Sequence, residues 1–263
     1  YKCWANDNII GNYMFSATIL NSILLPNNAV SLGNCAFSGC TSLANISIPD
    51  NVVTMGIHTF RECTALTDVK LGNSVTKIDE YDFLGCTSLV NINIPNSVTS
   101  IGDFAFSECA SLEKIDIPNS VTSIGSSVFQ NTGLKSVIIP DNITSISDYV
   151  FNNCSALESV TIPIGVTSIG RMSLSEVTCN AIEPPLFGDE GRVFDTSSSA
   201  TLHVPSGTYL TYINSDWAQY FEKIDDGESH GSYENGVATV EEAGTLAFLI
   251  PGSDKYSITK LKV

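Results

Sequence analysis

One pattern recurs every 22 or 23 residues through most of this chain, and it strongly limits the folds available to it. Each copy holds a phenylalanine followed by Leu-x-x-Ile-x-Ile, with Val or Leu in place of some Ile residues. Alternation over Ile-x-Ile predicts a short strand with one face in the core and one in solvent. Repetition at this period predicts a solenoid, because no single repeat can bury its own apolar face. The repeated phenylalanines are Phe15, Phe37, Phe60, Phe83, Phe106, Phe129 and Phe151, with Leu174 in the eighth place.

A proline ends each predicted strand, because it has no amide hydrogen for a β-ladder, and Asn, Asp or Ser then turns the chain. A second short extended piece follows, as at residues 98–101, and Gly102 ends it before a turn or 3₁₀ segment leads to the next phenylalanine. We therefore expect short parallel strands in a curved, right-handed stack of repeats with capped ends. The prolines are Pro26, Pro49, Pro95, Pro118, Pro140 and Pro163, with Gly72 in the remaining place.

Over residues 10–170 this pattern resembles the BspA-type leucine-rich repeat, a variant found in surface proteins of Bacteroides-like bacteria and of some mucosal parasites. The resemblance rests on the repeated Phe, the Leu-x-x-Ile-x-Ile strand and the proline after it. It implies a leucine-rich-repeat solenoid with a small α/β cap. It also implies a secreted or cell-surface protein, often discussed as an adhesin, and it implies no reaction and no cofactor.

The chain divides into a repeat array at residues 1–170 and three shorter segments. Residues 171–226 predict a C-terminal cap built from a strand and a short helix rich in aromatic residues. Gly, Asp and Ser in residues 227–235 indicate a linker. Residues 236–263 have the order strand, helix, strand, similar to the N-terminal cap of such repeat blocks. We expect them either to start a second block or to dock on another copy, which would give self-association.

The charge of the chain excludes several kinds of partner. With 28 acidic and 12 basic residues its net charge is −16, and a field of that sign repels nucleic acid and anionic membrane. No apolar run approaches the roughly 20 residues that span a bilayer, so we expect no membrane insertion in this segment. We expect an extracellular or cell-surface protein. A signal segment is not present in this chain, and we expect any targeting segment to have been removed.

Five of the eight cysteines occupy one column of the repeat, three residues after the phenylalanine. We expect them to be reduced and buried as small apolar residues, since Thr132 replaces one without disturbing the repeat. Stacked repeats also bring such residues to a distance that a disulfide tolerates, so bridging stays an alternative. The column holds Cys40, Cys63, Cys86, Cys109 and Cys154, whereas Cys3, Cys35 and Cys179 lie outside it and their redox state is left open.

Residue patterns that indicate catalysis or metal binding are missing from the sequence. There is no Cys-x-x-Cys, His is too scarce for a zinc site, and no nucleophile or phosphate-binding motif occurs. His58 lies two residues before a repeat phenylalanine, in a column that also holds Tyr13, Tyr81 and Tyr149, which indicates a packing or surface position. We therefore predict no enzyme activity, no cofactor and no metal.

The predicted strands carry two columns of side chains that point away from the core, and these are the candidate protein-binding surface. Solenoids bind partners through such extended concave faces, because these positions vary without harm to the core. The columns lack the Trp, Tyr and Arg anchors of tight interfaces. The first column is Asn45, Asp68, Asn91, Lys114, Ser136 and Ser159, and the second is Ser47, Lys70, Asn93, Asp116, Ile138 and Thr161.

Other repeated surfaces support weaker hypotheses. The Thr-Ser pairs, such as Thr99 with Ser100, predict a structural ladder, because stacked Thr side chains stabilise a sheet. Trp217 and Phe221 are expected in the core of the cap rather than on a sugar-binding platform. Three functions remain open: a non-enzymatic adhesion or host-protein-binding module, a surface glycan-binding protein, and a passive spacer.

Overall fold

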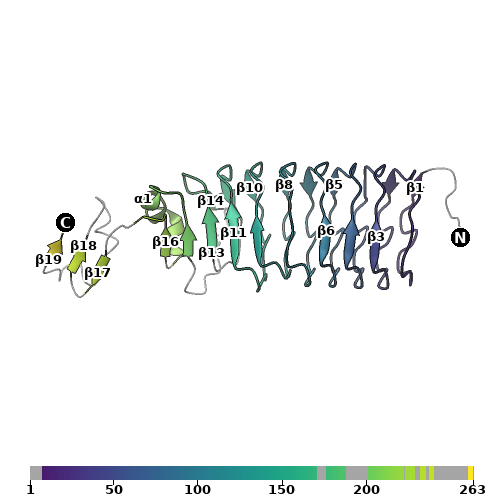
Figure 1. The fold of residues 1–263 in the computed structure, drawn as a ribbon, viewed down its shortest axis with the longest axis horizontal. Coiled ribbons are helices and arrows are strands. Elements are labelled where there is room, and N and C mark those ends of the chain that lie inside the picture. The colour runs from purple at the N-terminus through teal and green to yellow at the C-terminus, as the bar shows by residue number, and fades with distance from the viewer. Residues whose placement is uncertain are drawn as a thin grey trace.

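The computed structural model describes residues 8–170, 176–187, 201–221 and 223–228, together with three further short strands towards the C-terminus. The chain winds as a parallel-strand β-solenoid of about nine turns of roughly 23 residues, with very little helix (Figure 1). We call one turn a rung. The solenoid predicted from the repeat is therefore confirmed.

The Ile-x-Ile segments form one line of strands along the rod, and every pair in it is parallel. In register, Ile46 lies beside Val69, which lies beside Ile92, so equivalent repeat positions stack. The line consists of two sheets in the orders β3-β4-β6 and β9-β11-β13-β15-β16. Their bounds are β3 Asn45–Ser47, β4 Asp68–Lys70, β6 Asn91–Asn93, β9 Ser136–Ile138, β11 Ser159–Ile162, β13 Glu176–Cys179, β15 Thr201–His203 and β16 Lys223–Asp225.

A second line of strands, each of two residues, runs along another side of the rod. These are the predicted second extended pieces, and they pair in parallel as β1-β2, β5-β7-β8 and β10-β12-β14. Each is short because the glycine or turn after it redirects the chain. Their bounds are β1 Ile9–Ile10, β2 Ser31–Leu32, β5 Lys77–Ile78, β7 Ser100–Ile101, β8 Ser123–Ile124, β10 Ser145–Ile146, β12 Ser168–Ile169 and β14 Leu186–Phe187.

The third side of each rung consists of consecutive turns that bring the phenylalanine into the core. Two residues of these turns, four positions apart, have positive φ in each rung, as at Tyr81 (φ 59°) and Gly85 (φ 72°). These two residues and the phenylalanine midway between them donate backbone hydrogen bonds to the next rung, such as Phe37 N–H to Thr59 O and Phe60 N–H to Asp82 O, both at 2.9 Å. The turn side is thus hydrogen-bonded from rung to rung, as the strand sides are.

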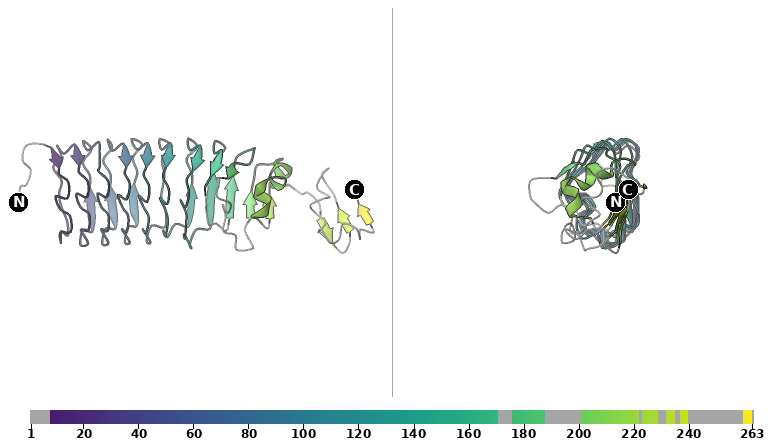
Figure 2. Two further views of the ribbon diagram at one scale, coloured as in Figure 1. Left: turned by 180° about the vertical axis from the view of Figure 1, so that it is seen from behind. Right: turned by 90° about the vertical axis from the view of Figure 1, so that its left-hand side faces the viewer.

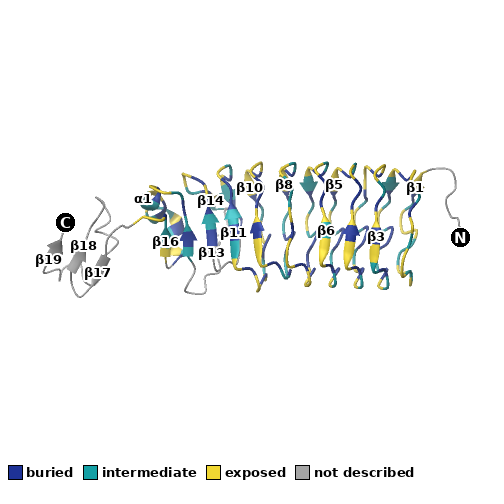
Figure 3. Ribbon diagram, viewed as in Figure 1, coloured by how far each residue is buried: buried dark blue, intermediate teal, exposed yellow. Residues whose placement is uncertain are grey.

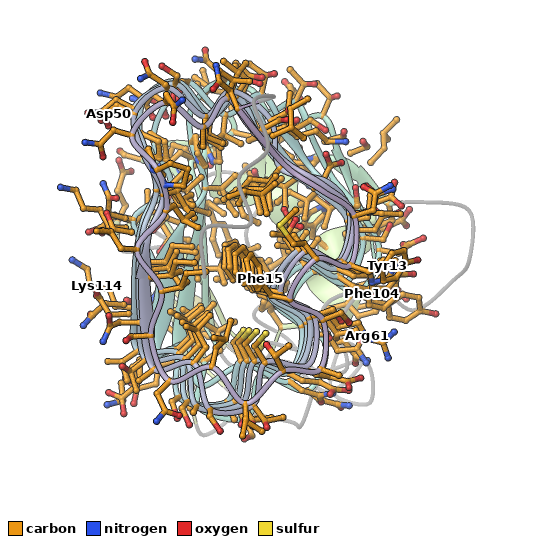
Figure 4. The ribbon with its side chains drawn as sticks, turned by 90° about the vertical axis from the view of Figure 1, so that its right-hand side faces the viewer. Tyr13, Phe15, Asp50, Arg61, Phe104 and Lys114 are labelled. Carbon is orange, nitrogen blue, oxygen red and sulfur yellow. The ribbon has the colours of Figure 1, made fainter. Side chains whose placement is uncertain are left out.

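Six of the repeat phenylalanines are fully buried and all seven stack in one column along the rod axis. Neighbouring rings lie 5.1 to 5.9 Å apart between centroids, and their planes are within 14° of parallel. Figure 4, which looks along the rod, places Phe15 at the centre of the rung with polar side chains around the outside. Figure 3 shows buried, intermediate and exposed residues interspersed along the rod.

The curvature of the stack is slight over the described rungs. Figures 1 and 2 show the rungs standing parallel along the rod, and the view along the axis superimposes them. A solenoid bends when its rungs are spaced more widely on one side than on another. Here both the strand side and the turn side are joined by backbone hydrogen bonds, which fix a similar spacing on each. The strand side is consequently nearly flat.

The segment expected as a C-terminal cap continues the strand line. β13 and β15 are the strands expected there, while β16 was not predicted and lies in a stretch whose Asp and Gly residues resemble a loop. The expected aromatic helix is α1 (Tyr209–Ile213) followed by the 3₁₀ turn η1 (Asp216–Gln219). Its aromatic side chains pack against the strand line, which closes this end of the core.

The predicted linker, residues 227–235, contains the strand β17 (Ser232–Glu234). It pairs antiparallel with β18 (Val237–Thr239), which pairs in parallel with β19 (Lys260–Lys262). A three-residue strand has too little alternation to be visible in a Gly- and Ser-rich sequence, so only its pairing reveals it. The predicted helix within residues 236–263, the loop at 188–199, and Cys3 lie outside the described residues.

Candidate protein-binding face

The outward side chains of the first strand line, from its N-terminal end to β11, form the surface that we call the strand face. In β3 and β4 the middle residue is buried and the two beside it are exposed, because successive strand residues point to opposite sides. The structure therefore brings the two predicted columns together on one side of the rod. Ten of the twelve predicted residues are exposed, and Ser159 and Thr161 are half-buried.

Four charged residues lie on the strand face, and only two of them are paired there. Lys114 Nζ lies 3.1 Å from Asp116 Oδ1, although their side chains are 78% and 85% exposed. Within the described residues, neither Asp68 nor Lys70 has an ion-pair partner within 4.0 Å. An ion pair this exposed contributes little stability, about 0.2 to 1 kcal/mol. All four charged groups are therefore available to a partner.

The strand line is interrupted at residues 114–117. Among the described residues, no backbone hydrogen bond joins this segment to β6 or to β9. The interruption coincides with a shortened corner in the next rung, where Thr132-Gly133-Leu134 replaces a longer Cys-x-x-Leu corner. A Cβ on Gly133 would lie 2.3 Å from Ala110 O, so the short corner presses against the preceding rung and requires glycine.

Two shallow hollows lie on either side of the interrupted rung. The larger, about 560 Å³, is lined by Asn91 and Asn93 together with the four charged residues. The smaller, about 240 Å³, lies between Asp116 and Ile138. The strand face is therefore hollowed where its charges are concentrated.

One exposed apolar residue of this face was missed. The Leu-x-x-Ile-x-Leu copy at residues 20–25 places Leu24 in the same column as Ile138, and the structure leaves it 89% exposed. Ile138 is 72% exposed. Extending the column by one more copy of the repeat would have found Leu24. The face therefore carries apolar side chains near both of its ends.

A family model described as BspA type leucine rich repeat region, in six copies, matches residues 8–134, 85–196 and 122–216. Together these matches span well over half of the chain. The chain belongs to the BspA-type leucine-rich repeat family. This family and its solenoid fold typically serve as non-enzymatic protein-interaction modules.

Several solved structures are similar to this BspA-type chain. The T. pallidum leucine-rich repeat protein is 31% identical, with a TM-score of 0.54 over 65% of this chain and 77% of that one. A leucine-rich repeat protein from Bacteroides ovatus is 22% identical, with a TM-score of 0.48 over 74% of this chain and 64% of that one. A leucine rich cell surface protein from Faecalibacterium prausnitzii is 21% identical, with a TM-score of 0.39 over 84% and 83%.

The chain thus spans slightly less than two thirds of the Bacteroides ovatus protein. No curated protein gives a significant match.

The threonine column of this BspA-type array is part of its structure. The hydroxyls of Thr99, Thr122 and Thr167 each donate to a backbone carbonyl of the preceding rung at 3.2 to 3.3 Å. A hydroxyl that is already bonded within the rod has less to offer a ligand. The geometry agrees with the predicted structural ladder.

The aromatic column on the turn side is partly stacked. His58 lies 4.7 Å from Tyr81, and Tyr81 lies 5.1 Å from Phe104, between ring centroids. Each ring covers the face of the next, so mainly ring edges meet solvent, and Figure 4 shows Tyr13 and Phe104 on this outer side. Burial and the nearby Arg61 lower the pKa of His58, so its ring is neutral at pH 7. This column is a packing feature with an exposed edge.

Three aromatic residues of the cap, Tyr212, Trp217 and Phe221, are buried. Trp217 Nε1 donates to Pro185 O at 2.8 Å, and Tyr212 Oη donates to Ala181 O at 2.9 Å. Trp217 stacks near Phe221 and meets Tyr212 edge to face. These rings hold the end of the core closed, as expected for Trp217 and Phe221. Trp217 and Tyr212 are therefore not exposed as a surface on which a sugar could stack.

The cysteine column is free of disulfides among the described residues, and it does more than fill space. Each Sγ donates to the carbonyl of the repeat phenylalanine one rung earlier, for example Cys86 to Phe60 O at 3.1 Å and Cys109 to Phe83 O at 3.2 Å. The sequence predicted only apolar packing, because a weak thiol donor leaves no mark in a residue pattern. Burial raises the pKa of Cys86 to about 12, so this thiol stays protonated.

One buried carboxyl group was also missed. Asp82 is fully buried in the position just before a repeat phenylalanine, where most rungs have Ala, Thr or Val. Its oxygens accept the backbone N–H groups of Thr59 at 3.0 Å and Asp79 at 2.7 Å. Burial raises the pKa of Asp82 to about 7, against the lowering effect of these bonds. Both of its oxygens bond to the backbone, which identifies a structural role.

The described residues include no group of three His, Cys, Asp or Glu side chains that could hold a metal ion. Of the helices in the described part, none is long and apolar enough to cross a membrane. His203 lies on β15 with Nδ1 3.6 Å from Asp225 Oδ2. His230 lies outside the described residues.

Proposed function

We propose that this chain is a non-enzymatic binding module at the cell surface or in the extracellular space, and that it binds a partner protein through the strand face. The observation that carries the proposal is the larger hollow, which gathers the face's four charged residues around two Asn side chains. The threonine column and the aromatic column offer fewer groups to a partner, because the threonine hydroxyls are bonded within the rod and the aromatic rings cover one another. Adhesion to a host or microbial surface protein is the form of binding that the family resemblance favours.

The composition of the face indicates a partner bound with moderate affinity. Exposed Asp, Lys and Asn side chains supply hydrogen bonds and orientation, whereas tight interfaces are centred on buried Trp, Tyr or Arg. Leu24 and Ile138 provide the exposed apolar contacts. Because the charges on the face sum to zero, binding should depend on their arrangement more than on a net field.

The test is binding of the purified chain to a panel of extracellular-matrix proteins, host cell-surface proteins and glycans. The variant replaces Asp68, Lys70, Lys114 and Asp116 with Ala, which leaves the net charge unchanged. A matched control replaces Arg61, Glu62, Lys77 and Glu80 with Ala, which removes the same number of charges from other sides of the rod. Circular dichroism verifies that both variants fold.

A protein ligand that is lost in the strand-face variant and kept in the control would support the proposal. A protein ligand that binds both variants equally would refute the assignment of this face. A glycan ligand that survives in both would support the glycan-binding alternative, and no binding at all would favour the passive spacer.

A further inference from the structure

The charges around the larger hollow have a self-complementary layout. In one column Asp68, Asn91 and Lys114 succeed one another along the rod, and in the other column Lys70, Asn93 and Asp116 do. One charged rung has its acidic residue in the first column and its basic residue in the second, and the other charged rung has the reverse. A neutral rung of two Asn side chains lies between them. The pattern is that of a square with alternating signs at its corners.

Such a square matches a second copy of itself. When two faces meet about a two-fold axis that runs along β6, Asp68 of one copy lies opposite Lys114 of the other, and Lys70 lies opposite Asp116. A two-fold axis along the rod instead sets Asp68 opposite Lys70. Both arrangements bring only opposite charges together. Self-complementarity of this kind is the requirement for an isologous dimer.

The strand face is also suited to contact between two strongly acidic molecules. The chain carries a net charge of −16, so two copies repel one another over most of their surface. The four charges of the strand face sum to zero, and its other predicted residues are uncharged. Contact at this face therefore avoids the repulsion that acidic surfaces elsewhere would meet.

We infer that the strand face pairs with the strand face of a second copy of this chain, with Asn91 and Asn93 at the centre of the interface. This inference rests on the proposed function in one respect, since it uses the same face as the binding surface. It adds a specific partner, and it implies that a heterologous protein would compete with self-association.

The dimer should be weak and sensitive to salt. Seven rungs at about 4.8 Å and a strand of three residues at about 3.3 Å give a flat face of roughly 350 Å². A standard protein interface buries about 800 Å² on each partner. We therefore expect dissociation constants in the high micromolar range or above at low salt. Raising the salt to 0.5 M should weaken the dimer further, because exposed ion pairs are screened.

The experiment is sedimentation velocity of the purified chain over a concentration series in 20 mM and 500 mM NaCl, with two charge variants. The variant Lys70→Glu with Lys114→Glu makes all four corners acidic, and the variant Asp68→Lys with Asp116→Lys makes them all basic. Each variant alone should associate at least about tenfold more weakly than the original chain, since four attractive contacts become repulsive. An equal mixture of the two variants should recover association.

Recovery in the mixture would support the inference under either two-fold axis, because acidic corners then meet basic ones. A chain that stays monomeric at low salt up to millimolar concentration would overturn it, and so would association that neither variant changes. Failure of the mixture to associate would also overturn it. The proposed function is judged separately by the ligand panel, carried out at a concentration where the chain is monomeric, so either idea can fail without the other.

Discussion

The buried carboxyl of Asp82 makes the stability of this solenoid depend on pH in a defined direction. Its pKa is about 7 in the folded chain against 3.8 for an exposed Asp, because burial disfavours the charged form. The folded state therefore binds the proton more tightly than the unfolded state does. The stabilising contribution of protonated Asp82 is fully present below about pH 4 and is lost as the pH rises to about 7.

The size of the effect follows from the shift in pKa. A difference of about 3 units corresponds to about 4 kcal/mol between the two ends of this pH range. The isosteric variant Asp82→Asn cannot ionise, so its stability lacks this term while every other carboxyl group remains. The free energy of unfolding of the original chain minus that of Asp82→Asn should fall by roughly 2 to 4 kcal/mol between pH 4.5 and pH 8.

The assay is urea denaturation followed by far-UV circular dichroism at four pH values for both proteins. Asp103→Asn serves as a control, because this carboxyl group is exposed. A difference that does not change with pH would refute the reasoning. A difference that rises with pH would show that the N–H groups of Thr59 and Asp79 stabilise the charged form more than burial opposes it.

Three further substitutions test the core and the corners. Phe106→Ala removes a ring stacked 5.4 Å from Phe83 and 5.9 Å from Phe129, and it should lower the free energy of unfolding by about 3 to 5 kcal/mol in urea; an effect below 1 kcal/mol would contradict a close-packed column. Cys86→Ala removes the thiol donor to Phe60 O and should lower the free energy of unfolding by about 1 kcal/mol. In the native chain Cys86 should not react with a thiol reagent at pH 8, whereas in the unfolded chain it should. Labelling of the native cysteine column would contradict its burial. Gly133→Ala should lower the free energy of unfolding by about 1 to 3 kcal/mol, because the added Cβ would meet Ala110 O. Gly165→Ala is the control and should change stability less, because the atom nearest to its added Cβ lies 3.3 Å away. Equal effects of the two substitutions in thermal melts would argue against the tight corner.

The repeat predicts the residues of the strand face from the sequence alone. A side chain two positions along a strand points to the same side, and stacking copies at a fixed period aligns equivalent positions. The two columns from Asn45 to Thr161 follow from those two rules alone. The rules do not predict the interruption at residues 114–117, which coincides with the close approach of the shortened corner at Gly133 to the preceding rung.

The sequence by itself determined the solenoid, its phenylalanine core and its polar strand face, because these depend on local alternation and on a period that every copy repeats. Only the tertiary structure decided that the rod curves only slightly, that the cysteine thiols bond to phenylalanine carbonyls, and that a hollow lies among the four charges. Those features depend on spacings between rungs on different sides of the rod. Such spacings are set when all sides close together, and no single copy of the repeat contains them.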